Sequence, residues 1–283
     1  MKLRVGFFLT LLALSVIGCS TSATTSVPPT EPPALADVSP VPSTDDTPMP
    51  ADTPALNEVT MPTEMPKPTE IPATDLPALL GRLHWLGHAS FRLDAPPVIY
   101  IDPTEADDAW PKADVILISH DHSDHYAPAA LKVLSTAKTI IITSLTVAEM
   151  AKKDSIPAAE IRALKPGENT TVGEVTIAAL PAYNVNKNFH PKQAGNLGFI
   201  ITTQGETLYF AGDTDRIPEM KDLHPDVALL PIGGYYTMDA KEAALAAADL
   251  QARVVVPMHN RETDPETFRS LCDCQVVVLK DEK

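Results

Sequence analysis

The chain has 283 residues, 28 prolines and a formal net charge of −15. The charge divides into +2 for residues 1–19, −8 for residues 20–78 and −9 for residues 79–283. Because proteins that bind nucleic acid concentrate lysine and arginine on one face, a chain that is acidic in its main parts is not expected to bind nucleic acid. A local basic pocket for a small anionic substrate stays open.

The first nineteen residues have the pattern of an export signal. Lys2 and Arg4 precede an apolar run at 5–17, which is too short to span a bilayer. The run ends in Ile17-Gly18-Cys19, which resembles the lipobox of bacterial lipoproteins, where the cysteine becomes the lipidated first residue. We therefore expect residues 1–19 to be a lipoprotein-type signal peptide and Cys19 to anchor an extracytoplasmic protein to a bacterial membrane. Ordinary cleavage a few residues later, with Cys19 discarded, is the alternative.

A disordered linker is predicted for residues 20–78. This segment holds 14 prolines, 11 threonines and nine acidic residues against the single Lys67, and it has no aromatic residue and no cysteine. It cannot bury enough apolar surface to offset its ordering entropy, so we expect an extended tether. Residues 79–283 remain for one domain, which is enough for a sizeable core.

The first half of the domain alternates between short strands and helices. Strands are predicted at 82–85, 89–93, 98–101 and 115–118, the last being a continuous apolar run of the buried type. Helices at 128–137 and 146–153 are predicted on either side of a strand at 139–143. Further strands are expected at 161–164, 175–180, 197–202 and 207–210, with a turn at 166–169.

The second half repeats the pattern. Strands at 227–230 and 253–256 flank a helix at 239–250, whose Asp239 and Glu242 are predicted to form an N-terminal capping pair. The order of elements favours two sheets covered by helices over one doubly wound sheet. A last strand is expected at 276–279, and the nearby Cys272 and Cys274 are expected to be small buried residues in preference to a local disulfide.

Three histidines and two aspartates occur within six residues directly after the buried strand at 115–118. The segment is His120-Asp121-His122-Ser123-Asp124-His125, and the whole chain has only eight histidines. Loops at the carboxyl ends of such strands are where sites form, and imidazole and carboxylate groups at this spacing can converge on two cations. The pattern therefore predicts a metal site.

This segment matches the His-x-His-x-Asp-His signature of the metallo-β-lactamase superfamily of metal-dependent hydrolases, which the chain resembles over residues 81–260. Asp102 follows the strand at 98–101, Asp213 follows the strand at 207–210, and His259 follows the strand at 253–256, in the order of that superfamily. The resemblance implies an α/β fold, the four-layer αββα sandwich. Within the superfamily, the segments at 86–91, 211–215 and 230–234 resemble a branch related to sugar-phosphate lactonases and N-acylphosphatidylethanolamine phospholipase D.

The resemblance also implies the metal ligands. The first site would use His120, His122 and a third histidine. The second site would use Asp124, His125 and His259. Asp213 would bridge the two sites. Relatives often place the third histidine after a Pro-Ala-aromatic sequence, but here Asn184 takes that position. His190, later in the same loop, is the preferred candidate, and a first site with two histidines is the alternative.

The implied chemistry is hydrolysis by a hydroxide between two divalent metal ions. Zinc is preferred, with manganese and iron open, because histidine and aspartate ligands suit all three. Asp124 would orient the nucleophile, while His88 and Tyr236 are candidates for contact with the substrate. Two lysines beside His190 are candidates for holding an anionic group; they are Lys187 and Lys192.

The sequence thus predicts a membrane-anchored, extracytoplasmic metal-dependent hydrolase. Its substrate would be a small molecule with an ester, lactone, phosphoester or amide-like bond. The alternative is a noncatalytic lipoprotein module that a metal stabilises and that binds a ligand without turnover.

Overall fold

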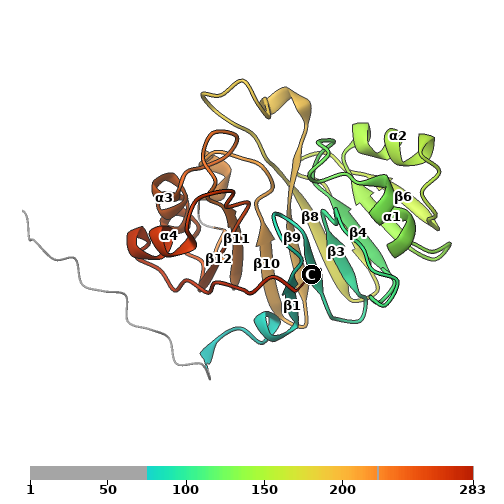
Figure 1. Cartoon of the computed structure of the whole chain (residues 1–283), viewed down its shortest axis with the longest axis horizontal. Coiled ribbons are helices and arrows are strands. Elements are labelled where there is room, and N and C mark those ends of the chain that lie inside the picture. Colours follow the sequence, from blue (N-terminus) through green and yellow to red (C-terminus); the bar gives the residue numbers. More distant parts are fainter. Residues whose placement is uncertain (1–74, 222, 283) are drawn as a thin grey trace, which may run out of the picture. The chain divides into compact units, whose positions relative to one another are not determined.

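The computed structural model describes residues 75–221 and 223–282 (Figure 1). The predicted signal peptide, the predicted lipidation at Cys19 and nearly all of the predicted linker lie outside the described residues. The domain starts with the 3-10 helix η2 (Ala78–Arg82), where the backbone N–H groups of Ala78 and Leu79 donate to the carboxylate of Glu206 at 2.8 and 2.7 Å. Across the part of the chain that the structure describes, no helix is long and apolar enough to cross a bilayer.

The first sheet contains six strands in sequence order. Its first three strands pair antiparallel, and the third to the sixth pair parallel. The strands are β1 (Leu83–Trp85), β2 (Phe91–Leu93), β3 (Ile99–Ile101), β4 (Val115–Ile118), β5 (Ile140–Thr143) and β6 (Glu160–Ala163).

The second sheet also contains six strands, in the order β12-β11-β10-β9-β8-β7. The pairs from β10 to β12 are parallel, and the pairs from β7 to β10 are antiparallel. The strands are β7 (Asn169–Val172), β8 (Val175–Pro181), β9 (Leu197–Thr203), β10 (Glu206–Phe210), β11 (Val227–Pro231) and β12 (Val254–Met258).

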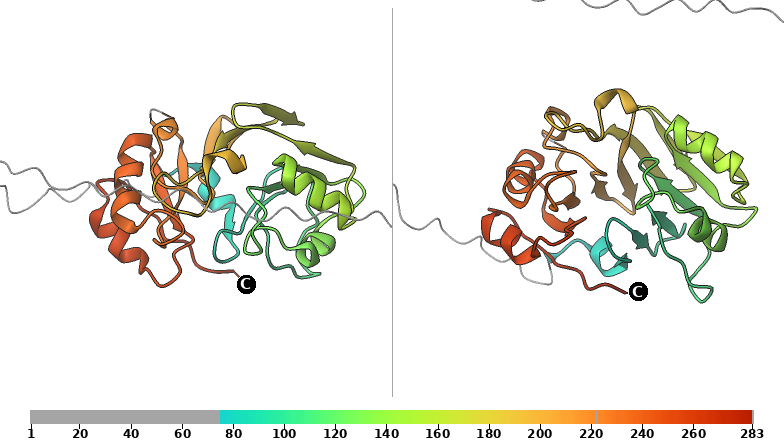
Figure 2. Two further views of the ribbon diagram at one scale, coloured as in Figure 1. Left: turned by 90° about the horizontal axis from the view of Figure 1, so that it is seen from above. Right: turned by 45° about the horizontal axis from the view of Figure 1, so that its top comes forward.

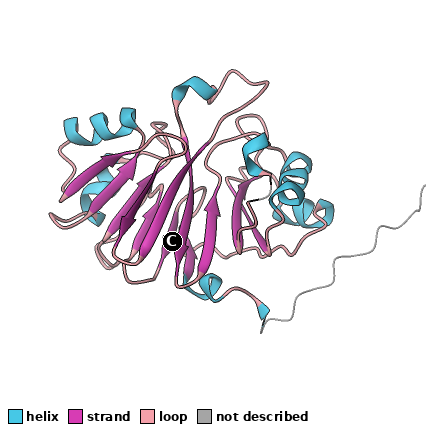
Figure 3. Cartoon of the chain, turned by 180° about the vertical axis from the view of Figure 1, so that it is seen from behind, coloured by secondary structure: helices cyan, strands magenta, loops and turns pink. Residues whose placement is uncertain are grey.

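Helices cover the outer face of each sheet (Figures 2 and 3). Leu131 and Val147 pack with Tyr100 and Ile116 of the first sheet, and Phe268 packs within the core of the second sheet. The chain therefore folds as helices, sheet, sheet and helices, which confirms the predicted αββα sandwich. The helices are α1 (Pro128–Leu134), α2 (Leu145–Lys153), α3 (Ala240–Leu250) and α4 (Pro265–Leu271), with short 3-10 helices η3 (Lys192–Ala194) and η4 (Pro218–Met220).

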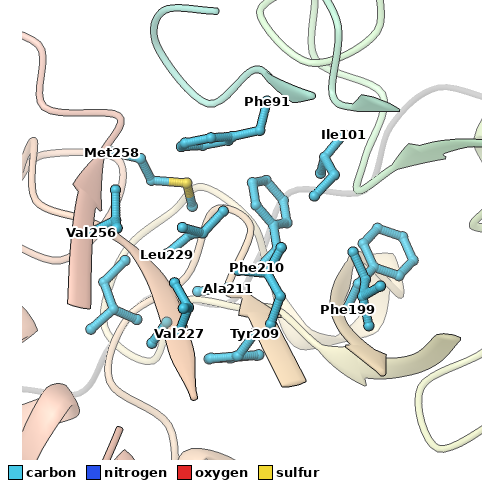
Figure 4. Close-up of a cluster of buried hydrophobic side chains, with 14 of the residues drawn as sticks. Phe91, Ile101, Phe199, Tyr209, Phe210, Ala211, Val227, Leu229, Val256 and Met258 are labelled. Atoms are coloured by element: carbon cyan, nitrogen blue, oxygen red, sulfur yellow. The ribbon is translucent and has the colours of Figure 1, made fainter. Parts of the chain in front are cut away.

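The main core lies between the two sheets (Figure 4). Phe91 and Ile101 come from the first sheet, and Phe199, Phe210 and Met258 from the second. All five side chains are fully buried, and the rings of Phe91 and Phe210 meet edge to face with centroids 6.4 Å apart. Each such burial stabilises the fold by about 1.5–3 kcal/mol, which makes the sandwich a firm support for the loops at its edge.

Several local expectations were wrong. The helix predicted at 128–137 ends at Leu134, and the segment at 276–279 forms an isolated bridge between Val276 and Val255 instead of a strand. Cys272 and Cys274 form a disulfide, contrary to the expectation of two small buried residues. The backbone becomes extended at Cys272, where α4 ends, and the Cα atoms of the two cysteines lie 5.1 Å apart. This separation lies within the range in which two cysteines can form a disulfide.

Candidate metal centre

The predicted site residues lie where strands of both sheets end. Asp102 directly follows β3, and the histidine segment that starts at His120 follows β4. In the second sheet, Asp213 comes after β10 and His259 directly follows β12. The predicted placement of polar side chains at the carboxyl ends of strands therefore brings groups far apart in the chain into contact.

His120, His122 and His190 form the first histidine group. The Nε2 atom of His190 lies 3.0 Å from Nδ1 of His122, and the ring centroids of His120 and His122 are 4.6 Å apart. His120 and His190 are buried, whereas His122 is exposed. Ring nitrogen atoms this close together match the donor set of a three-histidine metal site.

The loop between β8 and β9 brings His190 into this group. It projects beyond the sheets and is the gold segment at the top of Figure 1. The side chain of Asn184 donates to the carbonyl oxygen atoms of Phe189 and Tyr236 at 3.0 and 2.7 Å, and its backbone N–H donates to the carbonyl of His190 at 2.9 Å. Asn184 thus occupies the place of the expected histidine and fixes the loop that returns His190 to the site.

His88, Asp124, His125 and His259 form the second group. The Oδ2 atom of Asp124 lies 3.1 Å from Nε2 of His88, 3.9 Å from Nε2 of His125 and 3.8 Å from Nε2 of His259. Three of these side chains are predicted ligands of the second metal, and His88 is a predicted substrate contact. The geometry makes His88 a fourth candidate ligand, which its distant position before β2 concealed.

Asp213 lies between the two groups. Its Oδ1 atom is 3.3 Å from Nε2 of His125, and its Oδ2 atom is 3.2 Å from Nε2 of His259 and 3.5 Å from Nε2 of His190. The Asp213 side chain is buried, so its carboxylate interacts with histidines of both groups in surroundings of low dielectric constant. This is the geometry that a bridging ligand requires.

Asp102 and Ser119 orient two of the histidines. Asp102 accepts hydrogen bonds from Nδ1 of His125 at 2.7 Å and from the hydroxyl of Ser119 at 2.5 Å. Ser119 in turn accepts from Nδ1 of His120 at 2.9 Å. Because each Nδ1 carries the proton, each Nε2 is left as a lone-pair donor toward the site.

Several buried polar atoms in the site make no hydrogen bond within the described residues. They are Nε2 of His120, Nε2 of His125, Oδ1 of Asp213 and both ring nitrogen atoms of His259. An unsatisfied buried polar atom costs about 1–3 kcal/mol, so a cluster of them needs a partner. Every one of these atoms is a metal-ligand type, and the residues therefore fit divalent metal ions.

Four site residues have backbone conformations that non-glycine residues rarely adopt. The φ angles are 51° at His88, 43° at Asp102, 52° at His190 and 45° at His259. Left-handed backbone costs such a residue about 1–2 kcal/mol. The surrounding fold holds these side chains in place against that cost, as is typical of functional sites.

The two groups differ in charge. Burial lowers the pKa of His120 well below its usual value and also lowers the pKa of His190, so both are neutral at pH 7. Burial opposes charge on His259 as well, but the carboxylates of Asp124 and Asp213, which lie 3.8 and 3.2 Å from its Nε2 atom, prevail and raise its pKa to about 9. Burial also opposes charge on His125, but Asp213 and Asp102 raise its pKa well above the usual value. Without metal, protons therefore occupy the second group, and metal binding there would release them.

We expect the metal-free protein to lose stability between about pH 6.5 and pH 9. Because the pKa of His259 is raised to about 9, protonation of its imidazole favours the folded state. The contribution, about 3 kcal/mol, is complete below the unfolded-state pKa near 6.5 and is lost as the pH rises through 9. Urea unfolding of chelator-treated protein at both pH values measures it. Equal pH dependence in the wild type and His259→Gln would contradict the assignment.

The remaining predicted residues lie around this centre. Tyr236 contacts it through its backbone carbonyl, which accepts from Nδ1 of His190 at 3.2 Å. Lys187 pairs with Asp215, and Lys192 pairs with Glu219 at 2.8 Å. The expectation that these lysines hold an anionic substrate loses its basis, because carboxylates of the protein already neutralise them.

Comparison with known proteins gives one consistent result. The model of the Beta-lactamase superfamily domain matches residues 82–259. A UPF0173 metal-dependent hydrolase of Caldivirga maquilingensis is 34% identical over 211 residues, which cover 69% of this chain and 90% of the relative. A UPF0173 metal-dependent hydrolase of Archaeoglobus fulgidus is 32% identical over 227 residues, which cover 70% of this chain and 96% of the relative.

A solved structure from Parabacteroides distasonis is also similar, with a TM-score of 0.63 and 32% identity over 70% of this chain and 93% of that chain. The matched family region contains every proposed metal ligand, from His88 to His259. The chain therefore belongs to the beta-lactamase superfamily and, within it, to the UPF0173 metal-dependent hydrolases.

Proposed function

We propose that the protein hydrolyses an ester, lactone, phosphoester or amide-like bond of a small molecule with two divalent metal ions. The observation that carries the proposal is the position of Asp213, whose carboxylate lies within 3.2–3.5 Å of histidines from both groups. When bound, such ions polarise the substrate oxygen and supply hydroxide at neutral pH. Zinc is the preferred metal, because neutral imidazoles and carboxylates suit it and oxidation handicaps iron(II) outside the cytoplasm.

Asp124 is the proposed proton acceptor. The neighbouring imidazoles of His259 and His88 lower its pKa, so it is ionised at neutral pH. Its side chain is 50% exposed, whereas Asp213 is buried, so Asp124 lies where water and substrate enter. A carboxylate in this position can orient the attacking water, accept its proton and exchange that proton with solvent.

A metal-supplemented substrate screen tests the proposal. Phosphodiesters, lactones, acyl amides and phospholipids should be offered, since the motifs at 86–91 and 211–215 resemble lactonase and phospholipase relatives. We expect one class to be hydrolysed, chelation to stop turnover and zinc to restore it. If chelation unfolds the protein and no class is hydrolysed with zinc, manganese or iron, the noncatalytic alternative holds instead.

We also propose that Cys19 anchors the protein outside the cytoplasm. Cys272 and Cys274 form a disulfide, a bond that persists in oxidising compartments, and the third of the three cysteines is Cys19. The family match begins only at residue 82, so the segment with the lipobox-like sequence is an addition to the catalytic domain. The archaeal relatives lend no support to the anchor, which rests on these residues of this chain.

In a bacterial host, we expect the full chain to sediment with membranes and Cys19→Ala to remain in the soluble fraction. Two acyl chains on the cysteine would give stable anchoring where one would not. The double variant Cys272→Ser/Cys274→Ser is the matched control, since it keeps Cys19 and should stay with the membranes. Unchanged membrane binding of Cys19→Ala, or an unacylated Cys19 by mass spectrometry, would contradict the proposal.

A further inference from the structure

Arg261 lies beside the metal centre, two residues after His259. The turn places both residues in the left-handed region, with φ angles of 45° and 49°. The side chain of Arg261 packs across Gly233, where a Cβ atom would lie 3.1 and 3.2 Å from its Cγ and Cδ atoms and 2.3 Å from the carbonyl oxygen of His259. Glycine at 233 and the strained turn therefore hold this arginine against the loop at the edge of the site.

No carboxylate of the residues that the structure describes neutralises the charge of Arg261. Within residues 75–221 and 223–282, each of the other arginines has a carboxylate within 3.9 Å, whereas Arg261 has no such ion pair. Its guanidinium lies 4.9 Å from the centre of the Tyr236 ring instead. In a domain with a net charge of −9, an arginine without a carboxylate partner beside the centre is available to a ligand.

Aromatic side chains adjoin this arginine. The ring of Phe189 lies 4.5 Å from that of Tyr236 and 5.6 Å from that of Tyr235, measured between centroids. Tyr235 is 71% exposed, and Tyr236 bonds His190 through its carbonyl. The two loops that carry these rings thus present an exposed apolar surface that is joined directly to a proposed metal ligand.

We propose that Arg261 binds a carboxylate or phosphate group of the substrate while an apolar part of the same molecule packs on Tyr235 and Phe189. This inference rests on the proposed hydrolytic function and names the substrate class, an amphiphilic or aryl-substituted anion. A guanidinium suits this role because its planar array of donors matches both anions bidentately. Arg261 is exposed, so its guanidinium beside the Tyr236 ring is accessible to such an anion.

Binding measurements test the subsite apart from turnover. Isothermal titration of zinc-loaded protein with 4-phenylbutyrate, phenyl phosphate and the neutral 4-phenylbutyramide separates the two anions from each other and from the apolar part. We expect the wild type to prefer at least one anion over the amide by about tenfold or more, and Arg261→Gln to lose that preference with amide binding unchanged. Arg269→Gln removes an exposed arginine paired with Glu266 and should bind like the wild type.

An anion preference that persists in Arg261→Gln would show that the metal ions alone bind the anion, and it would overturn the proposed subsite. A wild-type protein that shows no preference for either anion would also overturn it. Turnover gives an independent readout with 4-nitrophenyl glutarate and its methyl ester. If both are hydrolysed, Arg261→Gln should raise KM for the anionic ester by about 10- to 100-fold and leave the neutral ester unchanged. Anion binding through Arg261 without hydrolysis of any substrate would refute the proposed function and leave the subsite standing.

Discussion

Replacing Asp213 with alanine should release metal from both sites and abolish hydrolysis. Asp213 faces His125, His259 and His190 within 3.5 Å, so its loss removes the carboxylate that the two groups share. We expect kcat/KM to fall by about 1,000-fold or more, because metal ions supply several kcal/mol of transition-state stabilisation. Inductively coupled plasma mass spectrometry of the purified variant, together with kinetics on a substrate from the screen, measures both effects.

Two further variants serve as a second ligand substitution and as a control for this experiment. His122→Ala removes an exposed member of the first group and should lower the metal content and activity without disturbing the core. His84→Ala is the matched control, because His84 lies between Asp94 and Glu282. We expect this variant to keep the metal content and the activity of the wild type. An Asp213→Ala protein with two metal ions and full activity would refute the bridging role.

Asp102→Asn should weaken zinc binding by about 10- to 100-fold while most of the fold persists. The buried Asp102 accepts from Nδ1 of His125 and from Ser119, which itself holds His120. An amide NH₂ group in place of Oδ2 would be a donor that faces the Nδ1–H donor of His125. This would disfavour the tautomer of His125 that leaves Nε2 free to bind a metal ion. Competition against a fluorescent zinc chelator measures the affinity.

Asp102→Ala should be more severe. It leaves three buried donors without an acceptor, which are the backbone N–H and the hydroxyl of Ser119 and Nδ1 of His125. We therefore expect the free energy of unfolding to fall by about 3–5 kcal/mol in urea titrations. The comparison of the two variants separates the orientation of the ligands from the stability of the domain. Wild-type zinc affinity in Asp102→Asn would contradict the proposed role of Asp102.

The strands that support the site could be predicted because burial on both faces leaves a clear mark in the sequence. β4 is a continuous apolar run, and its bounds at Val115–Ile118 match the prediction. The predicted capping of α3 by Asp239 is also confirmed, since its side chain accepts from the backbone N–H of Glu242 at 2.8 Å. The carboxylate of Glu242 accepts instead from the backbone N–H of Arg216 at 2.9 Å. Polar residues directly after such strands then indicated most of the centre.

Elements with little burial could not be predicted. β7 is half exposed and consists of Asn169, two threonines and Val172, which resemble turn residues in a sequence. α4 buries only Phe268, so no periodic apolar pattern marks it, although Asp264 caps it and proline follows. The segment at 276–279 has strong strand propensity, but propensity does not decide whether a neighbouring strand pairs with it.

The parts of the site that escaped prediction depend on tertiary contacts. His88 is a predicted substrate contact, but its place beside Asp124 as a candidate ligand depends on the packing of the first sheet. Ser119 has no sequence signal of its own, because its role depends on its contacts with Asp102 and His120. Arg261 acquires significance only because it is the arginine for which no carboxylate of the described residues forms an ion pair. Such relations join residues far apart in the chain, and spacing along the sequence does not record them.

Anomalous diffraction from crystals of the zinc-loaded protein can show whether the site holds two metal ions. We expect two zinc peaks. One should lie about 2.0–2.2 Å from ring nitrogen atoms of His120, His122 and His190, and the other at a similar distance from the second group, with Asp213 contacting both. Hydrolytically active crystals with one peak, or with no peak at these residues, would contradict a dinuclear metal centre.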